Sequence, residues 1–271
     1  NLAFWDAARG HYACYLRHGR NGFRSVALTT STDFLRWSDP RFLDFGDTPP
    51  EHLYTNAITP YFRDPSWLVG LPMRFVPGRR SVGDPPRLTD GVSDAVLVTS
   101  RDGVRFQRTF MEAFIRPGLN GHNWGHAHTN QTPAWGIHPA SPTHMAVYWT
   151  DNVGDVPELR RGLLRVDGFA SLHAGHGGGE AVTRPLAAVP GGHLVLNVST
   201  SAVGSVRVEL QGPDGAPLPG HAMADCAEIW GDEIARPVRW GERTRLPADV
   251  ARVRVRFVLK DADLYSFRFV P

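Results

Sequence analysis

The chain has 271 residues, enough to bury a sizeable core as one large domain or two. Its 29 basic and 27 acidic side chains give a formal charge of +2, which excludes bulk electrostatic attraction to nucleic acid. No apolar run approaches the roughly 18 residues of a membrane span, and two cysteines are too few for a disulfide framework. We therefore expect no nucleic-acid or membrane partner. The first residue already lies in a strand pattern, so the sequence leaves any targeting segment and the cellular location undetermined.

Two kinds of hairpin alternate along the first two thirds of the chain. One kind begins with asparagine, at Asn1, Asn56 and Asn130. The other has the pattern Ser-x-Asp-x3-aromatic in residues 24–37 and 93–106, with a weaker copy around an Asp-Gly pair in residues 161–172. Serine and aspartate oxygens in such a pattern accept hydrogen bonds from turn amides, so this motif predicts structure and implies no chemistry.

Each pair of hairpins makes a four-stranded unit, and the units recur at offsets of roughly 55 and 74 residues, as propeller blades do. Three blades cannot close a ring, because propellers typically have four to eight blades. We therefore expect either that upstream blades are missing from this chain, which we favour, or that a homo-oligomer supplies them.

The pattern changes to even alternation after a glycine-rich junction at residues 174–179. About seven short strands with turn signals predict an antiparallel β-sandwich. In one of these strands Val206, Val208 and Leu210 are expected to face inward, and Arg207 and Glu209 outward. The predicted fold is all-β, with partial β-propeller blades over residues 1–175 followed by a β-sandwich over residues 176–271; that the propeller is five-bladed is implied by the family resemblance described below.

Strand direction predicts which polar side chains share one face of the blades. The starts of strands 1 and 3 and the ends of strands 2 and 4 lie at the same end of a blade. Asp94 opens a third strand and Glu112 follows a fourth, so they are the candidate catalytic carboxyls. The candidate substrate-binding residues at this end are Arg17, Tyr54, Asn56, Arg74, Trp124, His128 and Asn130.

A structural interpretation stands beside each of these assignments. The asparagines could only cap strand ends, the arginines could pair with carboxylates, and Glu112 could anchor a loop to Arg116. His122, His126 and His128 have a spacing that fits a metal site, a substrate contact or an exposed loop. In the sandwich, the acidic loop at residues 225–233 fits a structural cation or pairing with arginine-rich strands. We assign no metal and no cofactor.

Four motifs carry a resemblance to a known family. They are SDAVLVTSRDG at residues 93–103, EAFIRPG at 112–118, NQTPAWGI at 130–137 and LKDADLYSFRF at 259–269. They resemble a bacterial branch of glycoside hydrolase family 32-like proteins, within the five-bladed group that includes family 43. The resemblance covers essentially the whole chain and implies a glycosidase fold and a carbohydrate substrate.

The catalytic pattern of that family is matched in part. Arg63-Asp64-Pro65 has the letters of its Arg-Asp-Pro stabiliser, although we interpret the segment as a hairpin turn. The Glu-Cys acid motif is absent, since Cys226 lies in the sandwich, and the family's nucleophile would lie upstream of Asn1.

We therefore expect a glycoside hydrolase that cleaves a poly- or oligosaccharide through Asp94 and Glu112. One alternative is a non-catalytic glycan-binding or scaffold protein, which asparagine at the strand starts favours. The other is a zinc-dependent lyase or hydrolase that uses the histidine loop.

Overall fold

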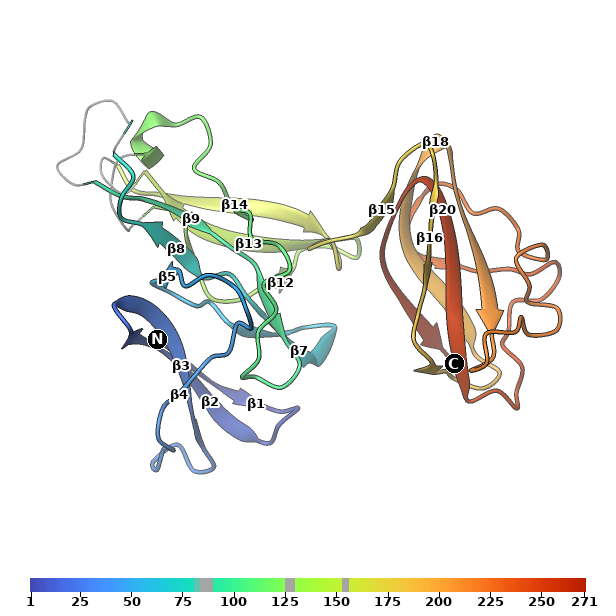
Figure 1. Cartoon of the computed structure of the whole chain (residues 1–271), viewed down its shortest axis with the longest axis horizontal. Coiled ribbons are helices and arrows are strands. Elements are labelled where there is room, and N and C mark those ends of the chain that lie inside the picture. The colour runs from blue at the N-terminus through green and yellow to red at the C-terminus, as the bar shows by residue number, and fades with distance from the viewer. Residues whose placement is uncertain (81, 83–89, 125–129, 153–155) are drawn as a thin grey trace. The chain divides into compact units, whose positions relative to one another are not determined.

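The computed structural model describes residues 1–80, 82, 90–124, 130–152 and 156–271 (Figure 1). Strands account for 52% and helix for 2%, so the predicted all-β fold, blade-like sheets followed by a sandwich, is confirmed. The chain divides into two compact units, Asn1–Leu163 and Leu164–Pro271. Among the residues that the structure describes, no helix is long and apolar enough to cross a membrane.

The first sheet is the first expected four-stranded unit, in the order β1-β2-β3-β4. One face is apolar, because the alternate residues Ala13 and Tyr15 of β2 pack with Val26 and Leu28 of β3 in one buried cluster. The strands are β1 (Leu2–Asp6), β2 (His11–Arg20), β3 (Phe23–Ser31) and β4 (Arg41–Phe42).

The second repeat is divided into two three-stranded sheets, in the orders β10-β7-β6 and β5-β8-β9. The break follows from Pro72, which has no N–H to donate to a ladder, while its carbonyl accepts from Val96 N at 3.0 Å. Bridges from Thr99 to Gln107 and from Ala95 to Ile115 supply a fragmentary outer strand. The strands are β5 (His52–Leu53), β6 (Thr59–Tyr61), β7 (Asp64–Gly70), β8 (Met73–Val76), β9 (Val92–Ala95) and β10 (Val98–Ser100).

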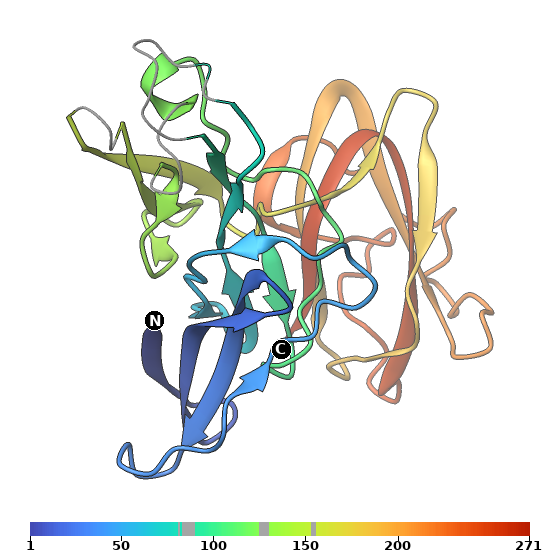
Figure 2. The same cartoon turned by 60° about the vertical axis from the view of Figure 1, so that its left-hand side comes forward.

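The sheet of the third repeat is centred on β13, which pairs with β11, β12 and β14. In both views the sheets of the second repeat lie between those of the first and the third (Figures 1 and 2). The elements are η1 (Gly121–Trp124), β11 (Thr132–Pro133), β12 (His138–Pro139), β13 (His144–Asp151) and β14 (Glu158–Arg165).

The strand that follows β14 does not pair within the sheet of the third repeat. The chain turns at Asp167, whose φ is 60°, and then forms β15 (Leu172–Ala174), which pairs with β20 (Arg252–Val270). The second unit therefore begins at Leu164, earlier than the expected boundary after residue 175.

The Ser-x-Asp turns have nearly the same geometry in both strong copies. Ser100 Oγ accepts from Gly103 N at 2.9 Å, and Asp102 Oδ1 accepts from Val104 N at 2.8 Å and Arg105 N at 2.7 Å. In the earlier copy, the equivalent bonds run to Ser31 and Asp33 from the amides of Phe34, Leu35 and Arg36.

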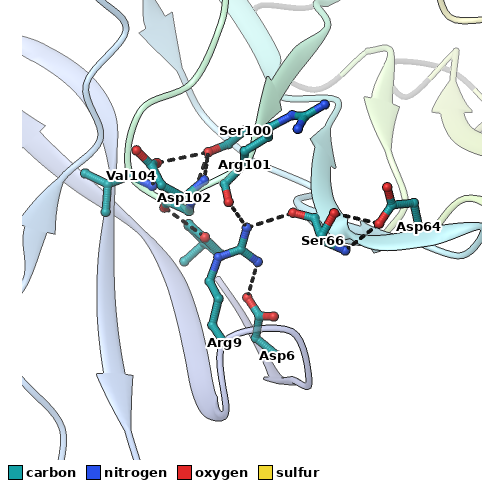
Figure 3. Close-up of polar contacts among 10 residues, drawn as sticks. Asp6, Arg9, Asp64, Ser66, Ser100, Arg101, Asp102 and Val104 are labelled. Carbon is teal, nitrogen blue, oxygen red and sulfur yellow. Dashed lines mark hydrogen bonds and ion pairs between the residues drawn. The ribbon is translucent and has the colours of Figure 1, made fainter. Parts of the chain in front are cut away.

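Arg9 joins the first repeat to the second at the end of the blades where these turns lie (Figure 3). Its Nη1 donates to Asp6 Oδ2 at 2.7 Å, and its Nη2 donates to the carbonyls of Ser66 and Arg101 at 2.9 and 2.6 Å. Asp6 is 1% exposed, in line with a structural role.

The second unit is built on two long strands, β18 (His193–Gln211) and β20, which pair antiparallel along their length (Figure 2). The register shifts between Thr200 and Ser205, and residues from both halves of β18 meet in one buried core. The sequence predicts several short strands in this part of the chain. In the structure, bulges join them into two long strands, β18 and β20. The remaining strands are β16 (Gly179–Val182), β17 (Leu186–Ala187) and β19 (Asp232–Pro237).

The expected alternation in the second half of β18 is confirmed except at one position. Val206, Val208 and Leu210 are fully buried, but Glu209, expected to face solvent, is only 4% exposed. The loop after β18 covers it, because Met223 N donates to Glu209 Oε2 at 2.9 Å. Both cysteines, one in each unit, are free thiols.

Candidate functional site

Arg74 near the start of β8 is the centre of a cluster of charged side chains. Its Nε and Nη2 donate to Oδ1 and Oδ2 of Asp94 at 2.9 and 2.6 Å, a bidentate pair. The pair follows from register, since Arg74 lies directly opposite Asp94 of β9. Hydrogen bonds to Asp94 raise the pKa of Arg74 above its ordinary value; Glu51 adds to the effect and burial opposes it.

Two residues that the sequence interpretation missed complete this cluster. Glu51 accepts from Arg74 Nη1 at 2.8 Å and from Arg108 Nη1 at 2.5 Å. The Arg108 side chain is 2% exposed, and those of Arg74, Asp94 and Glu51 are 17–18% exposed. The sequence offered no clear signal for either residue, because both lie in irregular segments beside short strands.

Glu112 lies beside this cluster without a bond to it among the residues that the structure describes. The carbonyl of the preceding residue, Met111, accepts from Arg74 Nη1 at 2.9 Å. The Glu112 side chain is exposed. The two candidate carboxyls thus differ, because Asp94 is fixed by an arginine and Glu112 is open to solvent.

An aromatic group borders the same end of the blades. The guanidinium carbons of Arg24 and Arg17 lie 4.4 and 5.6 Å from the ring centroid of Tyr54, close enough for cation–π attraction. The rings of Tyr54 and Phe75 meet edge to face at 5.2 Å. Tyr54 is only 8% exposed, so its ring holds the first repeat against the second and offers little surface to a ligand.

The three strand-opening asparagines form hydrogen bonds within the protein. Asn56 Nδ2 donates to Tyr15 O at 3.1 Å, and Asn130 Nδ2 donates to His122 O at 3.2 Å. Asn56 and Asn130 are 3% and 1% exposed, so neither side chain offers a free surface. Asn1 Oδ1 accepts from Arg17 N at 2.8 Å.

The remaining candidates lie around η1. Trp124 is 37% exposed and donates to Gly118 O at 2.8 Å, which leaves part of its ring accessible. His126 and His128 lie outside the described residues, so the metal alternative for the histidine loop stays a prediction. Within the described part of the chain, no group of three or more His, Cys, Asp or Glu side chains could hold a metal ion.

The other segments singled out in the sequence have local partners. Phe62 and Arg63 form a turn, and Asp64 Oδ1 accepts from Ser66 Oγ at 2.6 Å at the Arg9 end of the blades (Figure 3). In the sandwich, Asp232 pairs with Arg165, and Glu233 pairs with Arg236 at 2.6 Å. Two of the four carboxylates of the acidic loop, Asp232 and Glu233, therefore pair with arginines of β14 and β19.

A cavity of about 450 Å³ adjoins the charged cluster, because Glu51 and Arg108 are among its lining residues. Three aromatic rings also line it, those of Phe23, Phe42 and Phe45. Cavities that combine apolar walls with a few charged groups suit small polar ligands. This end of the blades thus combines a fixed carboxylate, an exposed carboxylate and a cavity for a small molecule.

No family model and no curated protein matches the chain. Among solved structures, an N-acetylgalactosamine deacetylase from F. plautii, in complex with blood group B trisaccharide, is 14% identical with a TM-score of 0.44. That match covers 62% of this chain and 50% of the deacetylase chain, so this chain spans about half of the deacetylase's length.

Two glycoside hydrolases match over more of the chain. The family 32 β-fructofuranosidase of Bombyx mori is 9% identical with a TM-score of 0.33, and the match covers 96% of this chain and 89% of that one. A family 43 arabinoxylan arabinofuranohydrolase from Bacillus subtilis is 10% identical with a TM-score of 0.26, covering 96% and 52%. Similarity at this level does not establish an activity for this chain.

Proposed function

We propose that this chain is carbohydrate-active and cleaves glycosidic bonds through Asp94 and Glu112. The observation that carries the proposal is the position of Arg74. Its guanidinium holds both oxygens of Asp94 and also bonds the carbonyl of Met111, the residue before Glu112. One arginine therefore connects the two segments that bear the candidate carboxyls.

The two carboxyls suit different roles in glycoside hydrolysis, which requires one charged carboxylate and one proton donor. Asp94 is held in a fixed orientation by Arg74, and its oxygens retain lone pairs, as a nucleophile or base needs. Glu112 is open to solvent and would donate the proton to the leaving oxygen. The stereochemistry of the released sugar, followed by NMR, would distinguish retention from inversion.

Release of reducing sugar from a panel of poly- and oligosaccharides tests this proposal. We expect turnover by the unmodified protein and a loss of at least about a hundredfold in Asp94→Asn and in Glu112→Gln. Asp64→Asn is the matched control, because Asp64 caps a turn at the other end of the blades and should leave turnover unchanged. Folding of each variant is checked by circular dichroism. Absence of turnover in the folded protein, or full activity in both variants, would refute the proposal.

A non-catalytic glycan-binding protein is the second candidate. It is supported by the residue type at the strand starts, because asparagine, unlike aspartate, carries no acid–base chemistry. Calorimetry separates the two functions, since this candidate predicts glycan binding with no turnover.

A further inference from the structure

Arg108 has an unusual environment for a buried cation. Its side chain is 2% exposed, and its Nη1 bonds Glu51, but Nε and Nη2 have no hydrogen-bond partner among the described residues. A buried donor without a partner costs free energy, commonly about 1–3 kcal/mol and more for a charged group. Such groups in native proteins call for an explanation, and a missing ligand is one.

Arg74 shows what this edge of a guanidinium can bind. Nε and Nη2 of Arg74 donate to the two oxygens of Asp94, in the fork geometry that matches a carboxylate. In Arg108 the same two nitrogens are free among the described residues. A group with two acceptor oxygens would therefore satisfy both unpaired donors of Arg108.

The cavity beside Arg108 provides a place for such a group. Its volume of about 450 Å³ lies in the range of roughly 300–1,000 Å³ typical of small-molecule sites. Arg20 and the rings of Phe23 and Phe42 line it, and the Arg20 guanidinium lies 5.2 Å from the Phe42 centroid. Apolar rings beside charged donors are the mixture that binds an acidic sugar.

Two carboxylates also line the cavity, and both already have partners. Glu51 is shared by Arg74 and Arg108, so these three residues and Asp94 form a neutral set of two cations and two anions. Asp44 accepts from Gly46 N at 2.9 Å and faces Arg105 at 3.9 Å. These two carboxylates would therefore repel an incoming anion only weakly, because arginines already compensate their charges.

We propose that this cavity binds a hexuronic acid unit of a glycan, whose carboxylate takes Nε and Nη2 of Arg108 after a shift of the side chains that bury these two nitrogens. Arg20 adds attraction at the cavity, and Phe23 and Phe42 provide apolar contact for the sugar ring. That the ligand is a sugar rests on the proposed function. That it is acidic rests on Arg108.

Calorimetric titration with glucuronate and galacturonate tests the proposal, with glucose, galactose and acetate as comparison ligands. We expect a uronate to bind at least about tenfold more tightly than the neutral hexose, which lacks the charged hydrogen bonds. It should also bind more tightly than acetate, which lacks the ring contacts with Phe23 and Phe42. Arg108→Gln should abolish the preference, and Arg20→Gln should weaken uronate binding several-fold. Arg101→Gln is the matched control, because Arg101 is exposed, lies over the ring of Trp67 and is outside the cavity lining.

Arg20 is exposed, so its variant keeps the test decisive even if Arg108→Gln fails to fold. Equal binding of uronate and neutral hexose, or uronate binding that Arg20→Gln leaves unchanged, overturns the proposal. Acetate binding as tight as uronate binding overturns the sugar part. Hydrolysis of glycans without uronate binding refutes this proposal alone. Uronate binding that Arg108→Gln removes, with no hydrolysis of any glycan, refutes only the hydrolase function.

Discussion

Arg74 bonds acceptors from three separate segments, Asp94, Glu51 and the carbonyl of Met111. These groups are largely withdrawn from solvent, so each carboxylate depends on the guanidinium for compensation of its charge. A lysine at the same position would keep the charge but could not form the bidentate pair and the other two bonds together.

We predict that Arg74→Lys lowers the free energy of unfolding by about 1–3 kcal/mol. Urea denaturation followed by circular dichroism measures the change. The control is Arg105→Lys, in which an exposed pair with Asp44 at 3.9 Å is altered and the change should stay within about 0.5 kcal/mol. Equal losses in the two variants would show that the cluster adds nothing to stability.

Part of this site could be predicted from the sequence, and the reason for the rest is physical. Strand order and direction placed Arg74 and Asp94 at the same end of the blades, where they pair. Glu51 and Arg108 were missed, because one precedes a two-residue strand and the other lies in a fragmentary outer strand. Irregular segments carry no periodicity from which the direction of a side chain follows.

At the scale of elements, the Ser-x-Asp turns couple stability to pH. Burial raises the pKa of Asp102, but the amide hydrogen bonds of Val104 and Arg105 outweigh it and leave that pKa below its ordinary value. Amide hydrogen bonds from Arg36 and Leu35 lower the pKa of Asp33. A lowered pKa in the folded state means that the stabilisation is complete above the unfolded value and is lost as pH falls through the folded one.

We therefore predict that a double variant, Asp33→Asn with Asp102→Asn, loses less stability on acidification than the unmodified protein. The asparagine oxygen still accepts the amide hydrogen bonds but does not titrate. Unfolding free energies measured between about pH 6 and pH 2.5 should fall more steeply for the unmodified protein, in the region below about pH 4. Parallel curves for the two proteins would exclude a contribution from these turns.

The bend of β18 depends on close backbone approach at one glycine. A Cβ at Gly204 would lie 2.2 Å from Asp261 O and 2.9 Å from Lys260 O, which are backbone atoms that cannot rotate away. The sequence predicted strands on both sides of this point but not their continuity. Register across a bulge depends on such contacts between residues far apart in sequence.

We predict that Gly204→Ala destabilises the protein by about 3 kcal/mol, measured by denaturant unfolding. Gly175→Ala is the control in the same unit, because its Cβ would meet nothing within 4 Å. It should leave stability unchanged or raise it by up to about 1 kcal/mol. A loss in Gly204→Ala no larger than that in the control would mean that the two strands separate there at little cost.

At the scale of the whole molecule, each unit has a buried cluster of its own. All members of one cluster lie between Ala174 and Leu264, and the members of the other lie between Ala13 and Phe106. A unit whose core is drawn from its own residues satisfies the main requirement for independent folding. The fold of the second unit was the more predictable of the two, because its strands alternate regularly and its core comes from that alternation.

We predict that residues 164–271 fold alone and unfold cooperatively. Trp240, which is 1% exposed and donates to Val208 O at 2.8 Å, should report the native core by blue-shifted fluorescence that moves to the red on unfolding. The other tryptophan of this unit, Trp230, is 66% exposed, so Trp240→Phe should leave only red-shifted emission and serves as the control. Water-exposed emission from Trp240 before denaturant is added, or a gradual transition, would mean that this core needs the first unit in order to form.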